Sequence, residues 1–134
     1  MPVEMNAKIY TLSWSLASSE SEIPNRSIIY QIYGDSPIYG RDKLLYIGQT
    51  DGDIARPFSH MDNKRINNFS VRYALCPKSE LDFLEAILIA THKPSYNEKC
   101  IADSTFIRTN DLRIVFNEDD RGDLLLETSN MYWL

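Results

Sequence analysis

Apolar and polar residues alternate near the start of the chain. Over residues 8–17 one side of the segment is mostly polar, and the other carries Tyr10, Leu12, Trp14 and Leu16. Because successive side chains of a strand point to opposite faces, this period of two predicts a strand with one buried face. A polar linker follows over residues 18–26.

Two short runs of β-branched and aromatic residues come next, at 28–33 and 44–48. Each is closed by a glycine, and the polar loop Asp35–Arg41 separates them. This combination is typical of two strands joined by a loop. Turn residues then lead into a short helix predicted over 54–66, with Asp53 as its N-cap.

The most apolar segment is Glu80–His92, which follows a third predicted strand at residues 70–76. Its apolar residues fall on nearly every side of a helical wheel, so we expect a central helix that is buried on most sides. Ser79 is its predicted N-cap, and Pro94 ends it.

Two β-rich segments lie near the end of the chain. Residues 105–116 and 123–128 flank the turn sequence EDDRG, which predicts a C-terminal hairpin. The last residues, MYWL, are apolar for a chain end, so we expect them to pack on the domain or on a partner chain.

Composition and charge narrow the function. A chain of 134 residues suffices for one domain with a core, and no apolar run approaches the length of a membrane span. The net charge of -5 argues against a bulk nucleic-acid binder, because affinity for the phosphate backbone comes mainly from Lys and Arg. Residues 26–100 nevertheless carry ten basic and nine acidic residues, so this middle part is the one suited to face a polyanion.

Cysteine usage favours a reduced, cytoplasmic protein. Cys76 and Cys100 fit free thiols better than a disulfide framework, and a bridge between them is the less favoured alternative. The two cysteines and two histidines match no zinc-ligand spacing, so a zinc or thiol enzyme is disfavoured.

Glu85 is a carboxylate within the apolar helix, on a narrow strip that it shares with Asp82 and His92. One interpretation is that this strip is the solvated edge of the helix. The other is that Glu85 lies at the rim of a cleft, where it would bind a hard divalent cation with phosphate oxygens and water as the other ligands.

Four more side chains have two interpretations each. Arg56 and His60 would share one face of the short helix, either as ordinary surface residues or as a phosphate-gripping arginine and a proton-carrying histidine. Tyr30 and Tyr46 would lie near each other on adjacent strands. They are either packing residues or tyrosines whose pKa falls beside a cation or metal.

The order of these motifs resembles the GIY-YIG nuclease family over roughly residues 27–98. Tyr30 corresponds to the tyrosine of the first motif, and Tyr46-Ile47-Gly48 is the second motif intact. Two features depart from the family pattern. Ile28 replaces the first glycine, and the loop Asp35–Arg41 is longer than usual.

The rest of the family pattern follows in order. Arg56 and His60 come ten and fourteen residues after Tyr46, at the positions of the family's arginine and its histidine or tyrosine. Glu85 matches the metal-binding glutamate of the central helix, and Asn97 follows Pro94 at the expected spacing.

The resemblance implies a role for each side chain. Glu85 would hold one Mg²⁺ or Mn²⁺ against the scissile phosphate, and Arg56 would bind that phosphate and stabilise the transition state. Tyr30 would activate the attacking water, directly or through a neighbour, while Tyr46 and His60 position it and help to move protons.

Gly48 and Asn97 would complete the substrate-binding side of the site. Asn97 is expected to anchor the loop after the helix or to brace the site. The resemblance also implies a small antiparallel three-stranded sheet flanked by helices, and the predicted order of elements is the same. We therefore expect an α/β (α+β) fold, in one domain over 1–134, extended by the N-terminal strand at 1–26 and the C-terminal hairpin at 99–134.

The predicted function is metal-dependent hydrolysis of DNA phosphodiester bonds, with restriction, homing, repair and junction-type roles left open. No DNA-binding module is apparent, so specificity would come from the extensions, from a homodimer or from a partner protein. The alternative is a non-catalytic module on the same fold that binds nucleic acid or protein, which the acidic ends favour.

Overall fold

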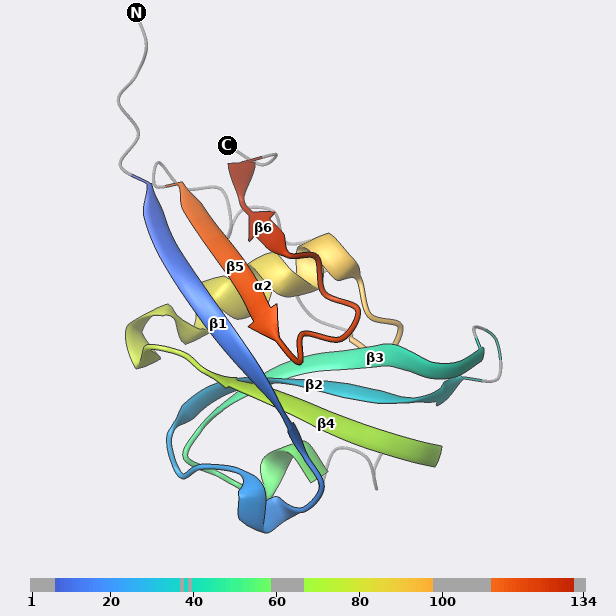
Figure 1. Ribbon diagram of the computed structural model, residues 1–134. Coiled ribbons are helices and arrows are strands. Elements are labelled where there is room, and N and C mark those ends of the chain that lie inside the picture. The colour runs from blue at the N-terminus through green and yellow to red at the C-terminus, as the bar shows by residue number, and fades with distance from the viewer. Residues whose placement is uncertain (1–6, 37, 39, 59–66, 98–111, 132–134) are drawn as a thin grey trace, which may run out of the picture.

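The computed structural model describes residues 7–36, 38, 40–58, 67–97 and 112–131. Within this part of the chain six strands form one mixed sheet in the order β3-β2-β4-β1-β5-β6 (Figure 1). The strands are β1 (Lys8–Ala17), β2 (Ser27–Ser36), β3 (Gly40–Asp51), β4 (Asn67–Leu75), β5 (Arg113–Asp119) and β6 (Glu127–Ser129).

The helix α2 (Leu81–His92) lies against one face of this sheet (Figure 1). It contacts β2 and β3 towards one edge of the sheet and β6 at the other. Since β3 and β6 are the outermost strands, the sheet has to curl around the helix. Two short 3-10 turns, η1 (Glu20–Glu22) and η2 (Lys78–Glu80), and a helical turn at residues 56–58 complete the described elements.

The predicted small three-stranded sheet flanked by helices is wrong. β1 lies between β4 and β5, antiparallel to the first and parallel to the second, so the N-terminal and C-terminal strands belong to one continuous sheet. The alternation of apolar and polar residues predicts that a segment is a strand, but it does not predict which other strand it pairs with. The pairing of Lys8 in β1 with Arg113 in β5 therefore could not be predicted from the local sequence.

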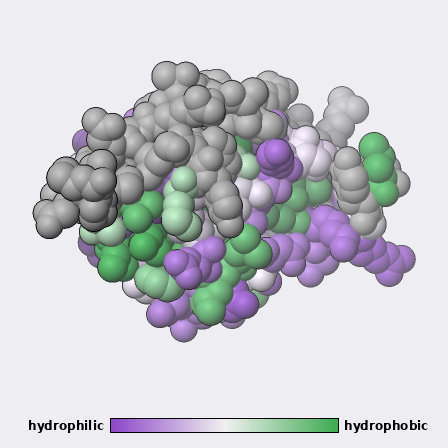
Figure 2. Space-filling model, turned by 90° about the horizontal axis from the view of Figure 1, so that it is seen from above, coloured by the Kyte–Doolittle hydropathy of each residue, from purple (hydrophilic) through white to green (hydrophobic). Residues whose placement is uncertain are grey.

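Several predicted boundaries also change. The strand at 8–17 is confirmed, but β2 and β3 extend so far that a short turn replaces most of the predicted loop Asp35–Arg41. In the view from above, hydrophilic residues lie along the lower right of the molecule (Figure 2). The predicted C-terminal strands shift to β5 and β6, and residues 105–111 lie outside the described part of the chain.

The core has two parts, one on each face of the sheet. The α2 face carries Leu12, Trp14, Ile47 and the apolar residues of the helix. The opposite face carries a second cluster around Ile28, Tyr30, Ile32, Leu45 and Val71. Both faces of β2 are covered by these clusters, so the strand is buried along most of its length.

The start of α2 is held by charge rather than by the predicted Ser79 cap. The N-cap residue is Glu80, and no side chain caps the helix. The Glu80 carboxylate instead accepts a hydrogen bond from Arg113 Nε at 2.7 Å, and the guanidinium lies over the Phe83 ring at 3.9 Å. This largely buried ion pair fixes the beginning of α2 to β5.

His92 fixes the other end of α2. Its Nδ1 lies 2.9 Å from the Leu88 carbonyl oxygen, and its Nε2 accepts a hydrogen bond from the Leu125 N–H at 3.0 Å. Nε2 can accept only in the neutral ring, so the proton of that ring sits on Nδ1. Burial lowers the pKa of His92, and the charge of Asp123 opposes this shift.

We expect the free energy of unfolding to fall as the pH drops below about 6.5. The pKa of His92 is lower in the folded protein than in the unfolded chain, so the unfolded chain binds more protons in this window and acid favours it. The slope from this residue is at most about 1.4 kcal/mol per pH unit. Urea unfolding of the wild type and of His92→Phe between about pH 8 and pH 5 measures it; an equal slope in both proteins would contradict the assignment.

Cys76 is a free thiol, and burial raises its pKa to about 12. Its predicted alternative partner, Cys100, lies outside the described residues. Within the described ranges no helix has both the length and the apolar character needed to cross a membrane.

Candidate active site

Tyr30 and Tyr46 come together on the sheet face opposite α2. Tyr46 pairs with Ile32 of β2, two residues after Tyr30, so both tyrosines point to the same face. Their ring centroids are 6.1 Å apart, and the ring planes are tilted by 32°. Tyr30 is fully buried, whereas Tyr46 is half-buried, so Tyr46 is the one nearer to solvent.

Gly48 makes the approach of the two rings possible. It pairs with Tyr30 across the β2–β3 ladder. A Cβ on Gly48 would lie 2.5 Å from the Tyr30 hydroxyl oxygen and 2.7 Å from Cε1 of Tyr46. The last residue of the second motif is therefore glycine because two aromatic rings occupy the space of a side chain.

The Tyr30 hydroxyl is the group on which the charges of two predicted site residues, Arg56 and Glu85, act. Burial raises its pKa well above the usual value for tyrosine, and the neighbouring Tyr46 raises it further. Arg56 opposes the shift through its charge and a hydrogen bond, and Glu85 adds a small increase through its negative charge. The hydroxyl thus lies within electrostatic range of a cation from one element and a carboxylate from another.

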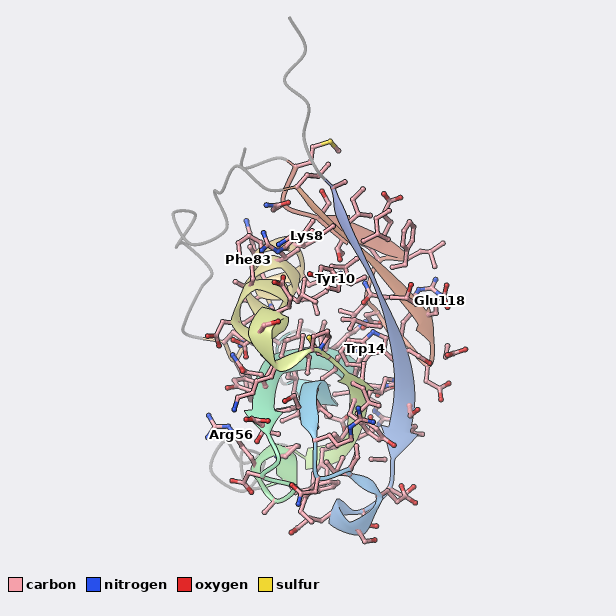
Figure 3. All side chains as sticks on the ribbon, turned by 90° about the vertical axis from the view of Figure 1, so that its left-hand side faces the viewer. Lys8, Tyr10, Trp14, Arg56, Phe83 and Glu118 are labelled. Carbon is pink, nitrogen blue, oxygen red and sulfur yellow. The ribbon has the colours of Figure 1, made fainter. Side chains whose placement is uncertain are left out.

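Arg56 reaches the Tyr30 hydroxyl from the turn that follows β3. Asp53 Oδ1 accepts a hydrogen bond from the Ala55 N–H at 3.2 Å, in the turn that leads into the helical residues 56–58, so the helix begins later than the predicted residue 54. Arg56 is exposed and projects from the outer side of the sheet end (Figure 3). The later part of the predicted helix 54–66, with His60, lies outside the described residues.

Glu85 is half-buried on the second turn of α2. One turn earlier, Asp82 accepts a hydrogen bond from Gln49 Nε2. Gln49 directly follows Gly48, so this contact ties the carboxylate-bearing helix to the strand that carries the second motif. The sequence pattern placed Asp82 beside Glu85 but gave no signal for its partner Gln49, which lies on a different element.

Asn97 braces the second motif from the side. Its Oδ1 accepts a hydrogen bond from the Ile47 N–H at 2.9 Å, and its Nδ2 donates to the Ile47 carbonyl at 2.8 Å. The Tyr96 N–H donates to the Leu45 carbonyl nearby. The segment after α2 thus covers the free edge of β3, which leaves the strand protected from pairing with another chain.

Asn97→Leu should lower the free energy of unfolding by about 2–4 kcal/mol, because it leaves the buried Ile47 N–H and C=O without partners. Leucine keeps nearly the same shape, so the loss would come from the hydrogen bonds. Urea unfolding is the measurement, with Ser95→Ala, an exposed change in the same segment, as the control. A loss equal to that of the control would contradict the bracing role.

Among the predicted site residues, Glu85 is the carboxylate that could ligate a divalent cation. No cluster of three or more His, Cys, Asp or Glu side chains that could hold a metal occurs among the described residues. Glu85 supplies one hard carboxylate, from the helix on the other face of the sheet, and its negative charge raises the pKa of Tyr30. Mg²⁺ commonly binds through one or two carboxylates and keeps water and substrate phosphates as its other ligands, so this donor set suits it.

Comparisons with protein-family models, with curated proteins and with solved structures returned no match. The functional argument therefore rests on the geometry of the site.

Proposed function

We propose that this protein is a divalent-metal-dependent endonuclease that hydrolyses DNA phosphodiester bonds, with a site organised as in the GIY-YIG nucleases. One observation carries the proposal: Tyr30 and Tyr46 pack against each other beside Gly48, at a point where the charges of Arg56 and Glu85 act on the pKa of the Tyr30 hydroxyl. A tyrosine pair that served packing alone would not require a cation and a carboxylate that both act on the pKa of one hydroxyl.

Arg56 supplies the positive charge. Its guanidinium is exposed and opposes the rise in the pKa of Tyr30 through its charge and a hydrogen bond; in this proposal it binds a phosphate and stabilises the extra negative charge of a pentavalent transition state. The same charge favours the ionised form of Tyr30.

Tyr46 is the member of the tyrosine pair that is accessible to solvent. The Tyr30 hydroxyl is buried, so its effect on the attacking water passes through a neighbour, and the half-buried Tyr46 is that neighbour. Tyr30 fixes the position of the Tyr46 ring, and Arg56 acts to lower the pKa of Tyr30. His60, in this proposal, orients the water or carries a proton.

Glu85 would hold the Mg²⁺ or Mn²⁺ ion. When bound, the ion would act as a Lewis acid that neutralises charge on the phosphate and the leaving oxygen. Gly48 lets the rings approach each other, and Asn97 keeps the backbone of the second motif in place beneath the DNA. Cutting both strands would require a homodimer or a second binding event, because one site cuts one strand.

A non-catalytic module that binds nucleic acid or protein is the second candidate. The raised pKa of Tyr30 favours it, because a phenol that stays protonated at neutral pH is not a base by itself. A bound divalent cation and Arg56 would both lower that pKa, so the two candidates differ in whether metal activates the site.

Arg56→Ala should reduce the rate of plasmid nicking on the order of 10²-fold, because it removes the phosphate-binding cation of the transition state. Arg41→Ala is the matched control, since Arg41 is an exposed arginine on the projecting hairpin. Single-turnover nicking of supercoiled plasmid in Mg²⁺ is the measurement. Equal rates for the two variants would contradict the proposed site, and absence of cleavage by the wild type would favour the binding module.

A further inference from the structure

A polar pocket opens at the end of the sheet where β2 begins and β3 and β4 end. It has a volume of about 330 Å³ and is lined by Arg26, Ser27, Leu75, Cys76, Pro77 and Lys78. Arg26 and Lys78 are both exposed and give the pocket two positive charges. Neither residue belongs to any motif of the proposed nuclease site.

The pocket adjoins the candidate active site. Arg26 contacts the turn that carries Arg56, because its carbonyl accepts a hydrogen bond from the Gly52 N–H at 3.2 Å. Leu75 pairs with Ile28, two residues before Tyr30 on the same face of β2. Figure 3 looks onto this end of the molecule, where Arg56 projects beside the sheet. The pocket, the tyrosine pair and Arg56 therefore share one end of the fold.

Lys78 is available to an incoming anion. It forms an ion pair with Asp51 at 2.9 Å, but the two side chains are 78% and 46% exposed. Such exposed pairs contribute little to stability and are screened by salt. Asp51 also accepts a hydrogen bond from Ser27 Oγ at 2.6 Å, so it stays anchored when Lys78 turns towards another partner.

We propose that the Arg26–Lys78 pocket binds a backbone phosphate of the DNA strand, next to the phosphate that is cleaved. This inference rests on the proposed function and extends its substrate site. Two basic side chains around an open pocket suit a phosphodiester group, and backbone contacts of this kind fix the register of a strand without reading its sequence.

A second pair of basic residues, at the other end of the fold, provides the comparison. Lys43 and Lys93 line another pocket, of about 420 Å³, at the opposite end of β3 and α2. That pocket also contains Asp123 and lies at the carboxyl end of α2, where the helix dipole repels anions. It carries the same number of Lys and Arg charges as the Arg26–Lys78 pocket but is the poorer phosphate site.

The test is the affinity for a fluorescein-labelled DNA duplex, measured by anisotropy in the Glu85→Gln background without divalent cation. Arg26→Ala/Lys78→Ala should weaken binding roughly tenfold and reduce the slope of log K against log[salt] by about two. Lys43→Ala/Lys93→Ala has the same charge change and should leave both quantities nearly unchanged. Circular dichroism melting confirms that each variant is folded.

Asp51→Asn should change the affinity for the duplex in the opposite direction. It releases Lys78 from its ion pair, so the duplex should bind severalfold more tightly, a result that a merely structural role would not produce.

The outcomes separate the two proposals. If the wild type nicks plasmid but the Arg26/Lys78 and Lys43/Lys93 variants bind alike, the phosphate pocket is wrong and the nuclease stands. If the wild type does not nick but only the Arg26/Lys78 variant loses affinity, the pocket stands and the nuclease is wrong. No duplex binding by any of the proteins would overturn the pocket.

Discussion

Replacement of Glu85 by glutamine is expected to lower the rate of metal-dependent DNA cleavage on the order of 10³-fold while the protein still binds DNA. The change keeps the size of the side chain and removes its negative charge. The negative charge of Glu85 acts on the pKa of Tyr30, and in the proposed site this carboxylate is the cation ligand that the substitution removes.

Asp82→Asn is the matched control for this prediction. Asp82 lies one turn before Glu85 on the same helix face, and asparagine retains an oxygen that accepts the hydrogen bond from Gln49. Single-turnover nicking at a range of Mg²⁺ concentrations compares the two variants. Similar rates for Glu85→Gln and the wild type would remove Glu85 from the metal site.

Gly48→Ala is expected to impair both folding and cleavage. The new methyl group would lie 2.5 Å from Cζ and from the hydroxyl oxygen of Tyr30, and 2.7 Å from Tyr46, distances that require the rings to move. Overpacking of this kind in a buried region costs about 1–3 kcal/mol. Because the atoms that must move belong to the tyrosine pair, cleavage should fall by more than the loss of folded protein explains.

Urea unfolding and single-turnover nicking measure the two effects. Gly40→Ala is the control, because Gly40 has a φ of +105° at the hairpin turn while its nearest neighbour, Lys43 Cε, would be 3.7 Å from the new Cβ. That variant should lose stability through backbone strain alone and keep its rate per folded molecule. Unchanged stability and rate in Gly48→Ala would show that the rings are not packed as described.

Local patterns predicted the elements better than their arrangement. The alternation at 8–17 and the apolar run of α2 each correspond to an observed element. Pairing is a long-range property: β1 joins β5 in parallel across most of the chain, which no local pattern encodes. The fold class was therefore wrong, although strands and helix were recognised.

The features of the site also divide into those that local patterns predicted and those that depend on the arrangement of the elements. Motif order drew attention to Tyr30, Tyr46 and Glu85, because their residue types and spacing are local features. Packing was one of the two interpretations of Tyr30, but its complete burial arises from a second core cluster on the face of the sheet opposite α2, which no local pattern encodes. The bond between Gln49 and Asp82 and the bracing of Ile47 by Asn97 also depend on which elements become neighbours in the fold.

The most direct test of the central claim is nicking of supercoiled plasmid by the purified wild-type protein, with Mg²⁺, with chelator, and with chelator followed by excess Mg²⁺. The proposed site predicts open-circular product with Mg²⁺, none with chelator, and recovery on addition of the metal. Cleavage that persists in chelator, or the absence of cleavage on duplex, branched and single-stranded DNA alike, would contradict the proposed nuclease.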